Sequence, residues 1–558
     1  MRLAERLGPF GREPWLVLAP LLLVQWIAVA VYALRVQRNG WLFYQGGDQT
    51  WFYTSGWILA GGHIPESIVG WVWALAMAPI AAVAGPSYLA GAPAVVLLQF
   101  LLLLPLGVVC VYAIASRIGG RPLGYWAAAW WVAIPFLVVP LFAERYQERW
   151  TEQTLPQALG LTGLGDFPSM IAVLASAVFV VRALDTRSST DVVLAGLLAG
   201  LAVGIKPANG LFVFAPVAAL LLARNPRAVV NFSLALLPGL VVLAVWKYRG
   251  SGIPLLGLES AAYAAADEVP DFSPPTFRER LAEYVPFDHH QLNLHFIYFR
   301  EFFWSARVLE WVPLAGLVAV ARRSVPLAGL LAVWLAAFFV IKGSSPVASV
   351  ESGSFWRLLM PAWPAYFLLA ISIPLLVPRL AQRLLGAVRP PRPPRVASRA
   401  LLVGAVVAFA VPAVALAALP PERNGRVAKM EHQSLFLPID ASFLPAAAAA
   451  ADGSIELTWP EATGAARPFY VVLRSERRYR YEATGEIVTR GHLCREGHGA
   501  LRCALQMEEV GRTRDRTFND RPPRGEWTYR IGVAANWRDD PEGGDVLVVS
   551  EGLDVAVR

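Results

Sequence analysis

Four charged residues beside long apolar runs could together bind an anion and move a proton. Asp48 and Asp166 are acids, and Lys206 and Arg357 are cations, each at the edge of an apolar run. Cationic side chains of this kind can hold a phosphate, and a carboxylate can take the proton of an attacking hydroxyl group. The four residues therefore predict a site for a phosphate-bearing substrate that resides in a membrane.

Asp48 is the candidate general base. It follows Gly46 and Gly47 and precedes several aromatic residues in the stretch 41–70. Aromatic side chains with polar tips favour the membrane–water interface, where an acid is costly unless it has a partner or a task. The structural alternative is an acid near the N-terminus of a short helix from Thr50 to Leu59, where the helix dipole favours it.

The other three charged residues also have structural explanations. Asp166 could cap a helix, since Pro168 would lie in the first helical turn. Lys206 could extend from an apolar segment to water, and Arg357 could anchor a helix at the interface. The functional interpretation therefore depends on all of them occurring together, at what we expect to be one face of the membrane.

The composition predicts that membrane helices position these residues. Of 558 residues, 56% are hydrophobic and 16% are charged, which is typical of a multi-pass protein of a plasma or inner membrane. The net charge of +8 does not indicate a nucleic-acid partner, because the arginines lie between apolar runs, where they set topology. The basic N-terminus precedes a run long enough to span, so we expect a retained first helix.

About 11–13 transmembrane helices are expected from the apolar runs. Several runs are shorter than the ~20 residues that a spanning helix needs, so tilting, pairing or re-entry is expected for some of them. The runs lie near 15–34, 68–84, 92–116, 122–142, 169–181, 190–205, 209–223, 228–246, 308–321, 325–341, 356–377 and 400–419.

Arginine-rich loops predict the orientation of these helices. Segment 379–399 holds six arginines and no acid, which indicates a cytoplasmic loop. Lys206 and the C-terminal tail then lie outside. Counting membrane crossings forward from a cytoplasmic N-terminus also places Asp48 outside. Counting crossings backward from an external tail places Asp48 inside if 68–84 crosses the membrane once. We expect Asp48 outside, which requires 68–84 to be a dip or hairpin, or another run to be split.

The C-terminal part has a different character. We expect a transmembrane domain at 1–420, a linker at 421–451 and a β-sandwich at 452–558, outside the cytoplasm. From Asp452 apolar residues alternate in short pieces separated by turn residues, the pattern of an antiparallel sandwich of about 100 residues. The alanine-rich segment Leu444–Ala451 is expected to be a linker or a short helix.

Cys494 and Cys503 lie in this C-terminal part. If it is exported, a disulfide closing a short loop is the leading expectation. The alternatives are two free thiols, or a metal site with His492 and His498, whose spacing matches no recognised zinc motif. Cys110 lies in an apolar run and is expected to serve packing only.

Motifs within residues 1–420 resemble the GT-C superfamily, membrane glycosyltransferases that use polyprenyl-phosphate sugars and include protein mannosyltransferases and lipid A aminoarabinose transferases. The first is an acid followed by a tyrosine, small residues and a proline, here Asp48, Tyr53 and Pro65. The second is an apolar run ending in Lys-Pro, here at Lys206. The third is an arginine followed by Leu-x-Pro-Ala, here at Arg357.

The resemblance implies sugar transfer from a polyprenyl-phosphate donor to a glycan, lipid or protein acceptor at the outer face. Asp48 would be the base, with Asp166 as a further catalytic candidate, while Lys206, Arg357 and Tyr53 would bind the donor phosphate. Membrane lipids would surround the helices.

Three departures from the family pattern bear on this expectation. The acid pair of the first loop is Asp48-Gln49 here, so a divalent metal ion at Asp48 or Asp166 is left open. The usual Pro-Pro is missing, and loop 249–306 has no aligned counterpart. The tail resembles a fibronectin type III domain, with Trp459 and Tyr529 in its core, which implies binding or positioning at the cell surface.

Two other function classes compete with an enzyme. A transporter or flippase of a lipid-linked or anionic substrate would carry ionisable residues at mid-membrane and repeat-related broken helices, whereas the charges here lie at the ends of runs and no internal repeat is found. A surface protein that displays the β-sandwich would need only one span as its anchor. The enzyme is therefore favoured, with sugar and acceptor left open.

Overall fold

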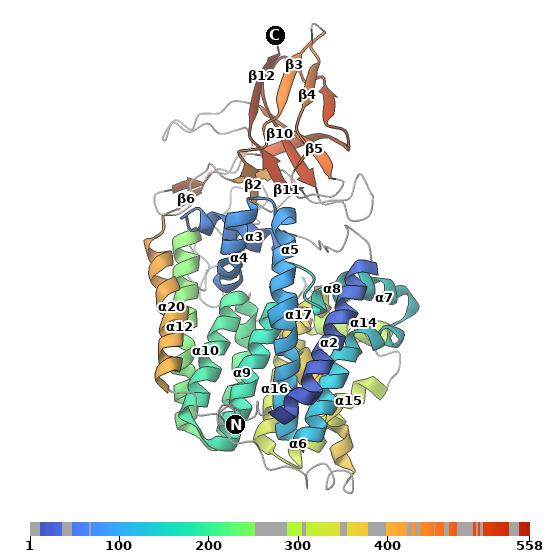
Figure 1. Cartoon of the computed structure of the whole chain (residues 1–558), viewed down its shortest axis with the longest axis vertical. Helices are drawn as coiled ribbons and strands as arrows, with labels where there is room; N and C mark the ends of the chain where they lie inside the picture. Colours follow the sequence, from blue (N-terminus) through green and yellow to red (C-terminus); the bar gives the residue numbers. More distant parts are fainter. Residues whose placement is uncertain are drawn as a thin grey trace. The chain divides into compact units, whose positions relative to one another are not determined.

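The computed structural model places helices in the first three quarters of the chain and strands in the last quarter (Figure 1). It describes residues 12–35, 47–65, 69–251, 287–303, 308–345, 354–377, 398–420, 427–430, 436–450, 452–462, 468–476, 495–497, 500–502, 506–534 and 546–557. The chain forms two compact units. Unit 1 comprises Met1–Val36, Leu97–Leu243 and Leu281–Val414, and unit 2 comprises Gln37–Val96, Ala244–Arg280 and Ala415–Arg558.

Most helices belong wholly or mainly to unit 1. In chain order they are α2 (Arg12–Arg35), η2 (Gln99–Leu103), α6 (Leu104–Leu137), η3 (Val139–Leu141), α7 (Glu144–Arg149), η4 (Trp150–Thr154), α8 (Leu155–Ala158), α9 (Asp166–Thr186), α10 (Ser189–Ile205), η5 (Pro207–Val213), α11 (Phe214–Leu222), α12 (Pro226–Ser251), α14 (His289–Phe302), α15 (Val308–Ala321), α16 (Val325–Gly343), α17 (Ser354–Leu359), η7 (Met360–Ala362), α18 (Trp363–Ile371), η8 (Ile373–Leu376) and α20 (Ser398–Ala418).

Six helical stretches of the described chain are long and apolar enough to cross a membrane. They are Pro14–Arg35, Tyr88–Leu137, Asp166–Thr186, Pro226–Gly250, Val325–Gly343 and Ser354–Leu376. Shorter apolar helices accompany them at Trp71–Ala84, Ser189–Ile205, Pro207–Leu222, Glu310–Ala321 and Val406–Ala418. The predicted class, a polytopic α-helical membrane protein, is confirmed.

The stretch Tyr88–Leu137 is broken in its middle. At a rise of 1.5 Å per residue its 50 residues would extend about 75 Å, far beyond a hydrocarbon core of about 30 Å. Gly119 and Gly120 have non-helical backbone angles, and Gly120 has a φ of 88°, which glycine adopts without steric cost. The break matches the expected separation of the runs 92–116 and 122–142.

Unit 2 contains a helical hairpin formed by α3 (Gly47–Ala60) and α4 (Trp71–Ala84), followed by α5 (Tyr88–Leu98). The two hairpin helices pack closely, since a Cβ atom at Gly56 would lie 2.8 Å from the Ala74 carbonyl oxygen. The 14 residues of α4 extend about 21 Å, less than the thickness of the hydrocarbon core. Residues 71–84 thus form one short helix, and the side of the membrane on which Asp48 lies stays a prediction.

Strands fill the C-terminal part, so the predicted β domain is confirmed. Strands β11, β2, β1, β8, β5, β10 and β12 form one sheet in that order, and β11 also pairs with β10. β3, β4 and β9 form a second sheet, and β6 pairs with β7. The strand bounds are β1 Val427–Met430, β2 Phe436–Asp440, β3 Ala446–Ala449, β4 Ile455–Thr458, β5 Phe469–Glu476, β6 Arg495–Gly497, β7 Ala500–Arg502, β8 Gln506–Thr513, β9 Thr517–Asp520, β10 Gly525–Ala534, β11 Val546–Ser550 and β12 Leu553–Val557.

The core of this domain follows from the two-residue period of its strands. Along β5, Val471 and Leu473 enter one apolar cluster, whereas Tyr470 and Val472 enter another, because successive side chains of a strand point to opposite faces. The second cluster joins the two sheets and contains the predicted core residues Trp459 and Tyr529. The Tyr529 hydroxyl donates to Asp520 Oδ2 at 2.6 Å.

One prediction about the C-terminal part needs correction. The expected linker 421–451 contributes β1, β2 and β3 to the sheets, and alanines 446–449 pair with β4. Main-chain hydrogen bonds to a neighbouring strand thus override the helical preference of alanine. The described pairings among strands within 452–558 are antiparallel, as predicted, and parallel pairing occurs where β1 and β2 of the expected linker join β8 and β11.

Some sequence predictions fall outside the described residues. These are the disulfide of Cys494 and Cys503, the alternative site with His492 and His498, and most of the loops 249–306 and 379–399. The disulfide stays a prediction.

Candidate functional site

Two cations of unit 1 bind one buried carboxylate. Lys206 Nζ donates to Asp166 Oδ1, and Arg357 Nε donates to Asp166 Oδ2 at 2.8 Å. The Asp166 side chain is only 2% exposed, whereas those of Lys206 and Arg357 are 21% and 22% exposed. These three residues, the ion trio, carry a net charge of +1, and both cations retain accessible surface.

Helix boundaries bring the first two members of the trio together. Asp166 begins α9, and Lys206 directly follows α10. The two helices pack against each other and are joined by a tight turn, where Arg187 is left-handed with a φ of 54° and Ser188 caps α10. A helical hairpin of this kind places the start of its first helix beside the end of its second, so residues 40 positions apart meet.

Prolines shape the backbone at both cations. Lys206 has an extended conformation, with φ −144° and ψ 116°, as expected for a residue before proline, and Pro207 opens the 3₁₀ helix η5. Arg357 lies in the short helix α17, which the 3₁₀ turn η7 follows at Pro361. The turn η7 contacts α9, which brings Arg357 to the carboxylate at the start of that helix.

The opposite ends of the same helices carry a separate set of ion pairs. Arg117 lies 3.5 Å from Asp185 of α9, and Arg182 lies 3.1 Å from Asp191 of α10. The ion trio is therefore at one end of the α9–α10 hairpin, and these four residues are at the other.

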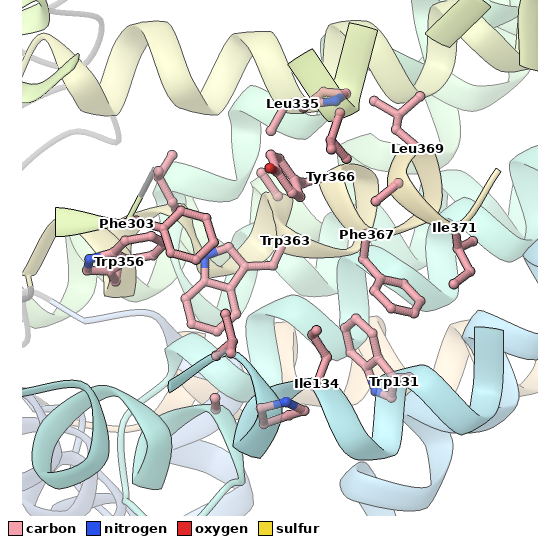
Figure 2. A pocket seen from close by; sticks show the side chains of 18 of the residues that line it. Trp131, Ile134, Phe303, Leu335, Trp356, Trp363, Tyr366, Phe367, Leu369 and Ile371 are labelled. Atoms are coloured by element: carbon pink, nitrogen blue, oxygen red, sulfur yellow. The ribbon is translucent and has the colours of Figure 1, made fainter. Parts of the chain in front are cut away.

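A large apolar cavity lies within unit 1. Its volume is about 860 Å³. It reaches the neighbourhood of the ion trio, because Phe167 and Trp356, the residues adjacent to Asp166 and Arg357, line it. Figure 2 shows Phe303, Trp356 and Trp363 toward one end and Phe367 and Ile371 toward the other, with Trp131 and Ile134 of α6 facing them. Gln25 and Glu310 are among the few polar residues of its lining.

Tryptophan rings hold the cavity wall beside Arg357. Trp150 stacks on Trp363 with ring centroids 5.7 Å apart, and Trp356 meets both rings edge-on at 5.7 and 6.3 Å. Trp356 also packs against Phe142 and Phe299. Because Trp356 precedes Arg357 on α17, this aromatic cluster fixes the position of the arginine.

Asp48 and Tyr53 belong to unit 2, on α3. Asp48 lies half-buried in the first turn. Its neighbour Gln49 is buried and accepts a hydrogen bond from the Tyr88 hydroxyl at 2.7 Å. Gln49, which stands where the family pattern has the second acid of the first loop, therefore has a hydrogen-bond partner in Tyr88.

The structure gives Tyr53 a packing contact, and its expected role in phosphate binding stays a prediction. Its side chain is fully buried, its hydroxyl donates to the Gly85 carbonyl at 2.9 Å, and burial raises its pKa. At 3.6 residues per turn, Tyr53 projects about 140° around the helix from Asp48, so the two side chains leave α3 in different directions.

Sequence reasoning missed one residue of the cavity wall, Trp363, and one buried acid, Glu152, which lies two positions after the wall residue Trp150. Trp363 was seen only as part of an apolar run, and nothing in the sequence shows that it faces a cavity. Glu152 is an acid with 8% exposure in the π-helical turn η4, a kind of turn that is frequent at functional sites. Its local sequence, with charged residues on both sides, resembles that of a solvated helix.

The donor set around the trio does not suit a divalent metal ion. Both oxygens of Asp166 accept from cationic groups, whose charge opposes a further cation. Among the described residues, no group of three or more His, Cys, Asp or Glu side chains gathers in a metal-binding arrangement. The ion trio therefore suits an anion better than a divalent metal ion.

Comparison with known proteins gives distant structural similarity. No protein-family model matches the chain, and no curated protein matches it. The Archaeoglobus fulgidus oligosaccharyltransferase in its apo form is 14% identical with a TM-score of 0.35, over 72% of this chain and 57% of that one. AglB from the same organism, in complex with an inhibitory peptide and a dolichol-phosphate, is 12% identical with a TM-score of 0.36, over 73% and 56%.

A third solved structure, of the A. fulgidus oligosaccharyltransferase in complex with Zn and sulfate, is 12% identical with a TM-score of 0.33, over 73% of this chain and 54% of that one. The chain thus spans little more than half the length of the solved structures that it resembles. The similarity is too distant to assign the chain to a family, and its function is inferred from its own residues.

Proposed function

We propose that this chain is a membrane glycosyltransferase that moves a sugar from a polyprenyl-phosphate donor to a hydroxyl group of a glycan, lipid or protein acceptor. The observation that supports this most is the position of the ion trio beside an apolar cavity of about 860 Å³. A polyprenyl phosphate has the two matching parts, an anionic head and an apolar chain. The motifs at Lys206 and Arg357 that resemble the GT-C superfamily supply these same cations.

In this proposal Lys206 and Arg357 hold the phosphate of the donor, and Asp166 positions them. The trio has a net positive charge and two partly exposed cations, so an anionic group can bind without displacing the carboxylate. Arginine presents a planar fork of donors that suits phosphate oxygens. Because both oxygens of Asp166 already accept from cations, we assign it positioning rather than the catalytic role expected from the sequence.

The reaction needs one base and one stable leaving group. The acceptor oxygen bonds to the anomeric carbon while the bond from that carbon to the phosphate oxygen breaks. The electron pair stays on the polyprenyl phosphate, whose charge the two cations stabilise. We assign the acceptor's proton to the Asp48 carboxylate on sequence grounds, as the acid of the first loop in a setting of glycines and aromatic residues.

We further propose that this chemistry occurs at the outer face of the membrane. The basic segment 117–121 lies at the break in α6, where Arg117 pairs with Asp185 at the end of α9 opposite the trio. The basic turns Arg224–Arg227 and Arg322–Arg323 lie between helices, at ends remote from Lys206 and Arg357, and basic loops favour the cytoplasm. If α4 does not cross the membrane, the count of membrane spans from the N-terminus agrees with the count from the C-terminal tail. Both counts then place Asp48 and the β domain outside.

A photo-crosslinking experiment tests the lipid site. Full-length protein in a neutral detergent is irradiated with a polyprenyl phosphate that carries a diazirine on its chain, and the labelled peptides are identified by mass spectrometry. We expect labelling of cavity residues on α6 and α18, and competition by undecaprenyl phosphate. Labelling confined to outward-facing residues such as Leu23, or labelling that undecaprenyl phosphate does not reduce, would contradict the proposal.

A further inference from the structure

The two cations of the ion trio are held in different ways. Aromatic rings around Trp356 fix the position of Arg357, whereas Lys206 follows the last residue of α10 and has an extended main chain. A lysine carries its charge on a long, flexible stem. Its head group is therefore well placed only where the main chain at the base of the stem is fixed, and the residue that fixes it belongs to the site.

Asn209 binds the main chain on both sides of Lys206. Its side-chain Nδ2 donates to the Ala202 carbonyl at 2.6 Å, and its main-chain N–H donates to the Lys206 carbonyl at 2.9 Å. The Ala202 carbonyl also accepts from the main-chain N–H of Lys206 at 3.1 Å. Both main-chain polar groups of Lys206 are thus bound within one turn, which the Asn209 side chain ties to α10.

The end of α10 explains why an asparagine side chain serves here. Pro207 has no N–H, so the regular hydrogen-bond ladder of α10 stops at the bond from Lys206 to Ala202. The side chain of Asn209 is 1% exposed, and because a carbonyl can only accept, its Nδ2 must face Ala202. Its Oδ1 atom is buried and has no hydrogen-bond donor among the residues that the structure describes. The bond from Nδ2 to Ala202 is therefore what holds this amide.

We propose that Asn209 is a positioning residue of the phosphate site, which fixes the base of the Lys206 side chain while Asp166 binds its head group. This inference rests on the proposed function and goes beyond it. A side chain that is held at both ends loses less conformational freedom when its ligand binds. Asn209 does not contact the lipid, so its effect on phosphate binding passes through Lys206.

Binding of two lipids to the full-length protein in neutral detergent tests the inference. Undecaprenyl phosphate and undecaprenol share the chain and differ in the phosphate. Asn209→Leu keeps the branched shape of the side chain and removes the Nδ2 donor together with the unpaired Oδ1, so we expect a melting temperature close to that of the wild type. Binding of undecaprenyl phosphate should weaken about 3–10-fold, whereas undecaprenol should bind with unchanged affinity.

The same substitution in a Lys206→Met protein separates positioning from general packing. Without the lysine there is no cation to position, so Asn209→Leu should cause no further loss of undecaprenyl phosphate binding. If Asn209→Leu does not fold, Asn209→Ala removes the same hydrogen bond without adding methyl groups, and the same results are expected of it.

Ser176→Ala is the matched control. The Ser176 hydroxyl donates to the Ala195 carbonyl at 2.7 Å, so it is another buried side chain bound to the main chain of α10. It lies further along α9 from Asp166 and has no contact with the turn at Lys206 that the structure shows within its described part. Its removal should leave the affinities for both lipids unchanged.

The possible results separate the inference from the proposed function. An undecaprenyl phosphate affinity in Asn209→Leu equal to that of the wild type, or an equal loss for both lipids, would overturn the positioning role. So would a further loss in the Lys206→Met protein, because Asn209 would then act without the lysine. If Lys206→Met alone binds undecaprenyl phosphate as tightly as the wild type, the proposed phosphate site itself is refuted, and the inference falls with it.

Discussion

Asp166 joins two cations that lie 40 and 191 residues away in the chain. Its side chain is almost fully buried, so the two cations depend on it for a counter-charge in a poorly solvated place. Removing one partner of such a buried pair usually costs about 3–5 kcal/mol, because the remaining charge is left uncompensated. The stability of this end of the bundle should therefore depend strongly on this carboxylate.

We expect Asp166→Asn to lower the free energy of unfolding of the detergent-solubilised protein by about 3–5 kcal/mol, measured by thermal unfolding. The double variant Asp166→Asn/Lys206→Met should recover part of the loss, because it also removes one of the two uncompensated charges. A melting temperature unchanged by Asp166→Asn would show that the trio contributes nothing to stability.

Asp48 should matter for turnover rather than for folding, because it is half-buried in the first turn of α3. We expect Asp48→Asn to keep the fold and the binding of polyprenyl phosphate, while turnover falls roughly 10²–10⁴-fold, the usual range for loss of a general base. Asp288→Asn is the matched control, since Asp288 caps α14. Near-normal turnover in Asp48→Asn would remove Asp48 from the mechanism.

Single residues were predictable from the sequence where a family-like motif lay at the end of an apolar run. Lys206 and Arg357 were singled out because each stands at the end of an apolar run. Their shared partner was not predictable, because contacts across 191 residues depend on how helices pack. Tyr53 was singled out by the family-like motif, and the hydrogen bond from its hydroxyl to the Gly85 carbonyl was not predictable from the sequence.

The elements follow the sequence most closely where prolines and glycines interrupt apolar runs. The expected gap between 92–116 and 122–142 contains the break at Gly119 and Gly120, and the expected run 356–377 matches Ser354–Leu376. Strand β3 was missed because its alanines carry no alternating pattern, and its conformation depends on pairing with β4.

Helices α10 and α12 pack closely, and glycine substitutions can test this packing. Gly196 and Gly200 of α10 face α12, and a Cβ atom at Gly239 would lie 2.6 Å from Gly200. We expect Gly239→Ala to destabilise the protein by about 1–3 kcal/mol, the usual cost of overpacking, as measured by thermal unfolding. Gly404→Ala makes the same change in helix α20 where a Cβ meets nothing within 4 Å, and it should be neutral or stabilising. Equal effects of the two substitutions would contradict the packing described here.

At the scale of the whole molecule, composition was enough to predict many membrane helices followed by a β domain. It did not predict the two units, because residues 37–96 group with the C-terminal part through contacts that no local pattern indicates. Residues 71–84 form a single helix of 14 residues, and the two counts of membrane spans agree only if this helix does not cross.

The proposed topology can be checked with a reporter enzyme that is active only in the cytoplasm. Fused after Arg558, it should be inactive, because the basic loop 379–399 and one span precede the β domain. The same reporter inserted into loop 379–399 should be active and serves as the control. Activity at Arg558 would overturn the orientation and would place the β domain in the cytoplasm.

The most direct test of the central claim is the affinity of the full-length protein for undecaprenyl phosphate when each cation of the trio is neutralised. Each charged hydrogen bond to phosphate contributes about 1.5–3 kcal/mol, so Lys206→Met and Arg357→Met should each weaken binding about 10–100-fold. Arg357→Lys should lose less, since it keeps the charge. Arg227→Met, an exposed arginine at the other end of the helices, should have no effect, and undecaprenol binding should be unchanged throughout. Undecaprenyl phosphate binding that survives both neutralising substitutions would contradict the claim that Lys206 and Arg357 form a phosphate site.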